Sequence, residues 1–355
     1  MLSQASPWKR EAYPRSTIPT MVATDELAYL HWLGREHWDG RTNVVEFGPW
    51  LGGTTNVLAA GMKRNPNRDL RAKLHTIDNF VWRSFMGDRA AVSLRAGESF
   101  RRVFDENMSD HLDLIVVHET RLPDDDLGDC QFDEPIRDQG SGVPLFAAGL
   151  VGGPIQVVFV DGAKSWHGLH HMLSQLTLGP GALVVLQDFQ DWASYWVPMM
   201  IGLLREQGTQ FELSHVLASG TISLRLMTDV DMNCVPVFPQ NITVEHGSRL
   251  VRSVVDWIAP EYPAAAHKVA LSEVVWLGVR DRWDESHALL QELAAHWPLR
   301  NRVGPLEQTM WWARRTSGRS VPQNRRVAAR HLAESADHRI RQAMSRVRPA
   351  VGSLR

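Results

Sequence analysis

The sequence VVEFGPWLGGTT, residues 44–55, joins an apolar run to an acidic residue and then to a glycine-rich turn. NVVEF (43–47) predicts a short buried strand, and TTNVLAAGMKR (54–64) predicts a helix with a threonine available to cap its start. In an open parallel sheet, ligands bind outside the carboxyl ends of the strands. The turn between this strand and this helix is therefore a candidate binding site.

The residues of the turn limit what it can bind. Gly48 is followed by Gly52 and Gly53, and Trp50 stands where a dinucleotide-binding G-x-G-x-x-G motif has its second glycine. That glycine lets pyrophosphate approach the backbone, so the Trp50 side chain would collide with a phosphate group. The turn suits a ligand without phosphates but with a cationic group, because Glu46 places an acid beside it.

Strands and helices alternate along the first two thirds of the chain. The predicted strands are 43–47, 73–80, 112–119, 155–162, 179–189 and two within 211–227. The predicted helices are 25–37, 54–64, 98–111, 165–176 and 196–208. This order predicts an α/β fold: a Rossmann-like, doubly wound, mostly parallel seven-stranded sheet with an antiparallel edge strand from the final hairpin.

After about residue 230 the pattern becomes helical, which divides the chain into four predicted parts. These are an N-terminal arm (1–24), an α/β domain (25–229), a helical appendage (230–312) and a basic tail (313–355) that is helical or partly disordered. The appendage carries helices predicted at 248–258, 264–281 and 284–297, and it is a candidate surface for a homo-oligomer. Residues 120–145 are acidic and lack a pattern, which predicts a long loop of the kind that is often functional.

Composition excludes several classes of protein. With 355 residues, 44% of them hydrophobic, the chain can bury a sizeable core. Its two cysteines, Cys130 and Cys234, cannot build a disulfide framework, and neither has a CxxC partner for zinc. There is no signal-peptide core and no run of about 18 apolar residues, so we expect no membrane partner and a cytoplasmic location.

The predicted tail is strongly basic. Between Arg314 and Arg355 there are eleven arginines and two acidic residues, whereas the net charge of the whole chain is -2. Such a tail either binds nucleic acid or packs on an acidic body. No aromatic residues interleave with the arginines after Trp312, so we expect packing and no nucleic-acid partner.

Over residues 25–227 the chain resembles class I S-adenosylmethionine-dependent methyltransferases. VVEFGPWLGGTT is similar to their first motif, and especially to that of small-molecule O-methyltransferases of the macrocin/sugar and catechol/caffeoyl-CoA types, acid–x–G–x–x–x–G–G–(S/T). The resemblance implies that Glu46 helps to hold the amino group of the cofactor. It also implies that the turn lies under the methionine part, which makes cofactor-binding candidates of Gly48, Trp50, Gly52, Gly53 and Thr54.

Two later segments agree with this resemblance in their order. HTIDNF ends a predicted strand at Asp78, where a carboxylate accepts the ribose hydroxyls. VVFVDGAKSWHG carries Asp161 and Lys164 in the family's Asp-x-x-Lys pattern, which implies that Asp161 binds a divalent metal and contacts the cofactor, while Lys164 deprotonates the acceptor hydroxyl. Lys164 would need a depressed pKa for that role, and His167 is the reserve base.

The sequence leaves open whether the protein binds a metal. GALVVLQDF supplies Asp188 at the next strand end, where Asp161 and Asp188 would share one Mg²⁺ or Ca²⁺. Phe189 stands where metal-dependent relatives have Asn or Asp, so one oxygen ligand is absent. Gln187 is expected on the opposite face of the strand.

The sequence thus predicts an S-adenosylmethionine-dependent O-methyltransferase of secondary metabolism. Its acceptor would be a hydroxyl of a small molecule such as a sugar, a polyketide, another natural product or a catechol-like ring. Two alternatives remain: a non-catalytic protein that binds S-adenosylmethionine or a partner, and an NAD-dependent oxidoreductase, which Trp50 disfavours. Of the 14 tryptophans, Trp166 and Trp192 flank the acidic strand ends and are candidate substrate contacts, and the others are expected in the core.

Overall fold

The computed structural model describes residues 6–14, 16–83, 86–87, 89–90, 92–123, 142–162, 164–237 and 239–296. They contain one seven-stranded sheet in the order β3-β2-β1-β4-β5-β7-β6. Its strands are β1 (Asn43–Phe47), β2 (Leu74–Asp78), β3 (Ile115–Glu119), β4 (Ile155–Val160), β5 (Leu183–Leu186), β6 (Phe211–Val216) and β7 (Ile222–Leu226). β7 runs antiparallel to both of its neighbours, β5 and β6, and all other neighbouring strands pair in parallel. The predicted α/β fold is therefore confirmed, with the hairpin of β6 and β7 at one edge.

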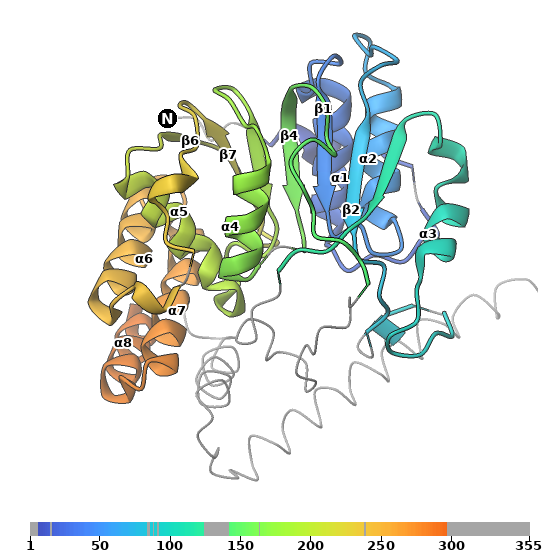
Figure 1. The fold of residues 1–355 in the computed structure, drawn as a ribbon. Helices are drawn as coiled ribbons and strands as arrows, with labels where there is room; N and C mark the ends of the chain where they lie inside the picture. Colours follow the sequence, from blue (N-terminus) through green and yellow to red (C-terminus); the bar gives the residue numbers. More distant parts are fainter. Residues whose placement is uncertain are drawn as a thin grey trace, which may run out of the picture.

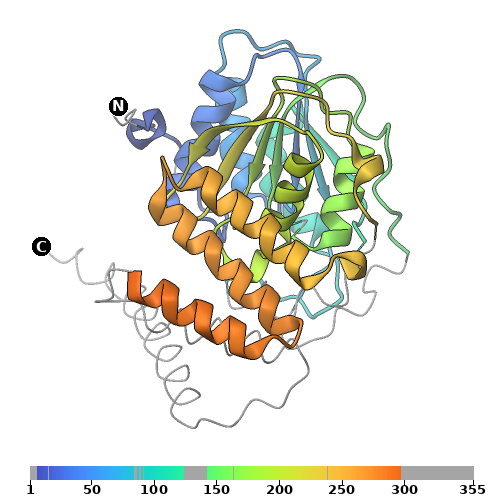
Figure 2. The ribbon, with the colours of Figure 1, turned by 90° about the vertical axis from the view of Figure 1, so that its left-hand side faces the viewer.

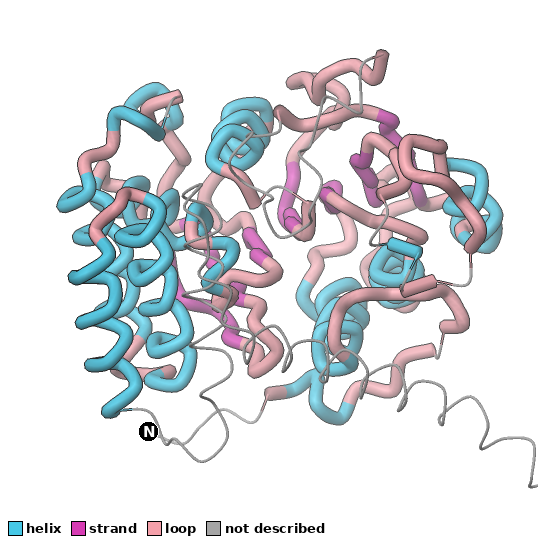
Figure 3. Tube along the Cα trace, turned by 90° about the horizontal axis from the view of Figure 1, so that it is seen from below, coloured by secondary structure: helices cyan, strands magenta, loops and turns pink. Residues whose placement is uncertain are grey.

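The described part of the chain contains eight α-helices, and helices flank the strands on both sides when the molecule is seen from below (Figure 3). They are α1 (Thr24–Trp32), α2 (Gly53–Lys63), α3 (Arg101–Asn107), α4 (Trp166–Gln175), α5 (Trp196–Glu206), α6 (Val244–Ile258), α7 (Pro263–Val279) and α8 (Trp283–His296). The predicted helix 25–37 is α1 followed by a short π-helix, Leu33–His37. None of the helices described is long and apolar enough to cross a membrane.

Alternating side chains of the central strands build two hydrophobic cores. In β4, Val157 and Phe159 join a core with α1, α2 and α3, whereas Val158 and Val160 join a core with α4, α5, α6 and α7. This two-residue alternation is the geometry of an extended strand, and burial on both faces explains why the strands read as continuous apolar runs. Figure 1 shows the result, with α1, α2 and α3 on the opposite side of β4 from α5, α6 and α7.

The start of α2 differs from the prediction. Its N-cap is Gly52, with φ +93°, and no side chain caps the first turn. Thr54 and Thr55 instead donate their hydroxyl hydrogens to Glu46 in β1. The threonines therefore fasten the helix to the strand rather than cap it.

Helices α6 and α7 continue the core of the sheet instead of standing apart from it. Leu250 and Val254 of α6 belong to the same buried cluster as Val158 of β4. A Cβ atom at Gly202 of α5 would lie 2.6 Å from the carbonyl oxygen of Leu250, so the two helices pack closely. Figure 2 shows α6, α7 and α8 layered in front of the sheet. The domain boundary near residue 230 stays a prediction, while the basic tail (313–355), Cys130 and most of the 120–145 loop lie outside the described residues.

Candidate functional site

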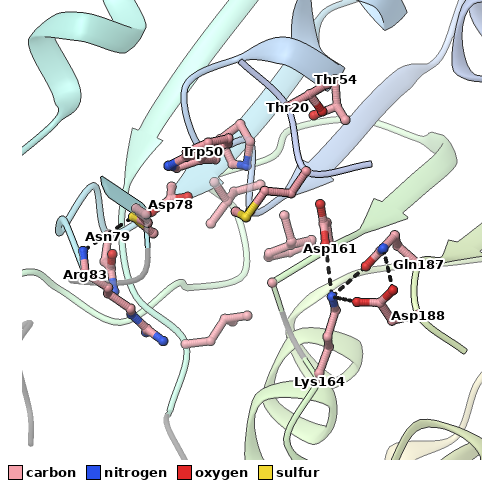
Figure 4. A pocket seen from close by; sticks show the side chains of 18 of the residues that line it. Thr20, Trp50, Thr54, Asp78, Asn79, Arg83, Asp161, Lys164, Gln187 and Asp188 are labelled. Carbon is pink, nitrogen blue, oxygen red and sulfur yellow. Dashed lines mark hydrogen bonds and ion pairs between the residues drawn. The ribbon is translucent and has the colours of Figure 1, made fainter. Parts of the chain in front are cut away.

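A cavity of about 360 Å³ opens at the carboxyl ends of the parallel strands. Its walls come from segments that directly follow β1, β2, β3, β4 and β5. The predicted site residues that line it are Gly48, Trp50, Gly53, Thr54, Asp78, Asp161, Lys164 and Asp188. Figure 4 shows Asp78 on one side of this space and Asp161, Lys164 and Asp188 on the other. Separate motifs thus converge on one cavity of the size that small ligands occupy.

The turn after β1 depends on left-handed backbone conformations. Gly48 and Gly52 have φ +83° and +93°. A Cβ atom at Gly48 would lie 2.7 Å from the backbone nitrogen of Gly162, so only glycine lets this turn touch the loop after β4. Trp50 has φ +47°, which costs a tryptophan about 1–3 kcal/mol. Its ring stacks on Trp82 and faces the cavity.

Glu46 does not line the cavity, which differs from the predicted contact with the ligand. It is fully buried, and its two carboxylate oxygens accept hydrogen bonds from Thr54 and Thr55, each 2.6 Å long. Burial raises the pKa of Glu46 to about 7, although the two threonine hydrogen bonds lower it. Glu46 therefore stabilises the turn through these two hydrogen bonds, from a buried position outside the cavity.

Asp78, the last residue of β2, presents a carboxylate to the cavity. Its Oδ1 accepts a hydrogen bond of 2.8 Å from the backbone N–H of Phe80. Burial raises the pKa of Asp78 to about 6, while the Phe80 hydrogen bond and the charge of Arg83 lower it. A shielded carboxylate at a cavity wall is a strong acceptor for paired hydroxyl groups.

The ammonium group of Lys164 joins the two acidic strand ends (Figure 4). Its Nζ donates hydrogen bonds to Oδ1 of Asp161 (3.1 Å), Oε1 of Gln187 (2.5 Å) and Oδ2 of Asp188 (2.5 Å). Burial lowers the pKa of Lys164, but the two carboxylates outweigh burial and hold the pKa above its ordinary value. Lys164 therefore lacks the depressed pKa that the role of general base would need. Lys164 is a cation whose three N–H groups are all engaged, and it is not poised as a general base.

Gln187 reaches this cluster because β5 ends earlier than predicted. The strand stops at Leu186, and Asp188 has φ +57°. The strand alternation that would turn Gln187 away therefore no longer applies, and its Nε2 donates a 2.5 Å hydrogen bond to Oδ1 of Asp188. Phe189 is fully buried in the core and contributes no oxygen to the site.

The side chains around Asp161 and Asp188 do not fit a divalent metal as they are arranged. Mg²⁺ or Ca²⁺ needs about six oxygen ligands. Here two carboxylates and the Gln187 amide oxygen already surround the Lys164 ammonium, whose positive charge would repel a metal. Among the residues that the structure describes, no group of three His, Cys, Asp or Glu is placed to hold one.

Several other predicted contacts lie outside the cavity lining. His167 is on α4 and does not line the cavity. Trp166 is fully buried, and its Nε1 donates a hydrogen bond of 2.9 Å to the carbonyl oxygen of Pro236. Trp192 packs against the small core formed by α7 and α8. Gly52 stands behind the turn, where a Cβ atom would lie 2.6 Å from Cε of Met108.

The N-terminal segment forms a wall of the cavity that the sequence did not indicate. Pro19, Thr20 and Met21 line the cavity. A Cβ atom at Gly53 would lie 2.7 Å from Cβ of Thr20 and 2.8 Å from the carbonyl oxygen of Pro19. Figure 4 shows Thr20 beside Thr54. The close packing of this segment therefore leaves no room for a side chain at position 53.

No protein-family model and no curated protein matches this chain. Solved structures do align with it. An O-methyltransferase from Streptomyces achromogenes involved in tomaymycin synthesis, in complex with S-adenosylmethionine, is 17% identical, with 58% of this chain and 81% of that chain covered and a TM-score of 0.36. An S-adenosylhomocysteine-bound methyltransferase from Podospora anserina is 12% identical, with 58% and 80% covered and a TM-score of 0.35. At these identities and TM-scores, the alignments assign no function to this chain.

Two contributors to the site carried weak signals in the sequence. Gln187 precedes Asp188 directly, but only the end of β5 at Leu186 lets both side chains serve one site. Pro19 to Met21 lie more than 20 residues before β1 in a segment without periodicity. The closely spaced Gly52-Gly53 pair was the available sign that another backbone segment approaches this turn.

Proposed function

We propose that this protein is an S-adenosylmethionine-dependent methyltransferase that transfers the methyl group to a hydroxyl of a small molecule. The observation that carries the proposal is a single cavity shared by the glycine turn after β1, Asp78 at the end of β2 and the Asp161–Lys164–Asp188 cluster after β4 and β5. A sugar, a polyketide or another natural product is the proposed acceptor class.

The lining of the cavity supports S-adenosylmethionine, rather than a dinucleotide, as the ligand. Asp78 would accept the ribose hydroxyls, and the turn from Gly48 to Thr54 would lie along the methionine part. Trp50 faces the cavity where pyrophosphate would need a glycine. Bound S-adenosylmethionine supplies an electrophilic methyl group on a sulfonium. The protein's own task is then to orient the acceptor and to remove its proton.

Asp161 is the proposed proton acceptor for the hydroxyl group. It lines the cavity, and Lys164 contacts only its Oδ1. Burial raises the pKa of Asp161, although the Lys164 charge opposes this, and a carboxylate with a raised pKa is a better base near neutral pH. Lys164 would hold the acceptor oxygen through one of its N–H groups, because it stays protonated.

Calorimetry with S-adenosylhomocysteine, the product of the donor, tests the proposal. We expect binding at a protein concentration of about 100 μM, since even a Kd near 1 mM leaves a measurable signal. Absence of binding would reject the proposal, and binding of NADH instead would favour an oxidoreductase.

Catalysis needs its own measurement. A screen for methyl transfer to a library of sugars, polyketides and catechols would identify the acceptor class. Binding of S-adenosylhomocysteine without turnover on any acceptor would point to a non-catalytic binding protein.

A further inference from the structure

We propose that Lys164 is a built-in cation that takes the place of a divalent metal between Asp161 and Asp188 and positions the acceptor oxygen. The positioning role rests on the proposed function. The exclusion of a metal rests on the geometry of the site alone, so each part has its own measurement.

Three oxygen atoms from two strand ends converge on one nitrogen atom. Oδ2 of Asp188 and Oε1 of Gln187 each lie 2.5 Å from Nζ of Lys164, and Oδ1 of Asp161 lies 3.1 Å away. A divalent cation held by the same atoms would lie about 2.0–2.6 Å from each of them. Nζ therefore fills the space that such a cation would need.

The end of β5 fixes this arrangement. Asp188 is held from both sides, because Oδ2 accepts from Lys164 and Oδ1 accepts from Nε2 of Gln187. The next residue, Phe189, is fully buried in the core and offers no further oxygen. The site thus has two carboxylates and one amide oxygen, and its positive charge is already covalently attached to the protein.

The reaction balances with this arrangement. A bond forms between the acceptor oxygen and the methyl carbon as the bond from sulfur to that carbon breaks, and sulfur keeps the electron pair. The hydroxyl proton passes to a carboxylate oxygen of Asp161. Lys164 keeps its three protons and gives the acceptor oxygen a hydrogen bond in place of the one to Gln187. No metal is needed to hold the oxygen, because the ammonium group does so.

Removal of the ammonium group tests the inference directly. Mn²⁺ binding is followed by electron paramagnetic resonance in the full-length wild type, Lys164→Ala and the double variant Lys164→Ala/Asp188→Asn. We expect the wild type to bind no Mn²⁺ below about 1 mM, and Lys164→Ala to bind at least about tenfold more tightly, because two carboxylates and an amide oxygen then face open space. The Asp188→Asn substitution should remove the gained binding.

A matched control uses another lysine that pairs with a carboxylate. Lys63 Nζ lies 2.8 Å from Oδ1 of Asp113 on the surface, and Lys63→Ala should gain no Mn²⁺ binding. Circular dichroism verifies that each variant folds, and Lys164→Ser replaces Lys164→Ala if the alanine variant does not.

Two results would overturn the inference: wild-type protein that binds Mn²⁺ as tightly as Lys164→Ala, or a folded Lys164 variant that gains no binding. The wild-type measurement alone can also reject the inference. Tight Mn²⁺ binding by the wild type would contradict the statement that Nζ of Lys164 fills the position of the cation. Mn²⁺ binding requires neither donor nor acceptor, so these outcomes are independent of S-adenosylhomocysteine calorimetry. If turnover is found, full activity in EDTA is the expected catalytic counterpart.

Discussion

Nζ of Lys164 lies 2.5 Å from Oδ2 of Asp188, although the two residues follow different strands of the sheet. This contact joins the segments that follow β4 and β5 on one side of the cavity. It also makes Lys164 a donor of hydrogen bonds and positive charge rather than an acceptor of protons.

Replacement of Lys164 by glutamine should impair turnover without weakening donor binding. We expect kcat for methyl transfer to fall by roughly 10²-fold, because the acceptor oxygen loses its charged hydrogen-bond partner. Removal of one positioned hydrogen-bond donor lowers the rates of other enzymes by a similar factor. The affinity for S-adenosylhomocysteine should stay within about threefold by calorimetry. Lys268→Gln, which changes a lysine outside the cavity lining, is the control. Equal turnover in the wild type and Lys164→Gln would remove Lys164 from the mechanism.

Asp78→Asn should weaken binding of S-adenosylhomocysteine. Hydrogen bonds to a charged group contribute about 1.5–3 kcal/mol, so the Kd should rise roughly 10- to 150-fold. Because the pKa of Asp78 is raised to about 6, wild-type affinity should decline as the pH falls through about 6, whereas that of Asp78→Asn should not. Asp69→Asn, an exposed carboxylate bonded to Arg71, is the control. A pH-independent wild-type Kd would contradict ribose binding by Asp78.

Glu46 should make the protein less stable as the pH rises. Its pKa is about 7 when folded and 4.5 ordinarily, so the folded state binds the proton more tightly than the unfolded state. The stabilising effect of protonation is complete below about pH 4.5 and is lost as the pH rises to about 7. Glu46→Gln lacks this ionisation, so its free energy of unfolding relative to wild type should increase by about 3 kcal/mol across that range. Urea unfolding at several pH values measures it, and a constant difference between the two proteins would refute the assignment.

Gly53→Ala should displace the N-terminal segment from the cavity. The added methyl group would lie 2.7 Å from Cβ of Thr20 and 2.8 Å from the carbonyl oxygen of Pro19. We expect a loss of stability of about 1–3 kcal/mol and weaker binding of S-adenosylhomocysteine. Gly152→Ala is the matched control, because its added methyl group would meet no heavy atom within 4 Å. Similar melting temperatures for the two variants would show that the N-terminal segment moves aside without a loss of stability, which would contradict the prediction.

The strands were predictable because apolar runs of five or six residues between turn residues have few other interpretations. The predicted strand 43–47 matches β1, and the predicted ends of β2 and β4 brought Asp78 and Asp161 to the same edge. What the sequence did not reveal depends on contacts across the fold. The raised pKa of Lys164 comes from oxygens on two separate loops, and the role of Gln187 follows from the left-handed backbone of Asp188. The resemblance to methyltransferases implied that Glu46 contacts the ligand, whereas in the structure Thr54 and Thr55 occupy both of its carboxylate oxygens.

The close packing of α5 on α6 has a consequence for synthesis of the chain on the ribosome. Leu204 of α5 shares its buried cluster with Leu250 and Val254 of α6, which are made about 50 residues later. Because the ribosome adds about 5–20 residues per second, several seconds pass before α6 is made and can pack on the apolar face of α5. During that interval the apolar face of α5 is exposed to solvent. Slowing translation between residues 206 and 258 should therefore increase binding of the nascent chain by chaperones.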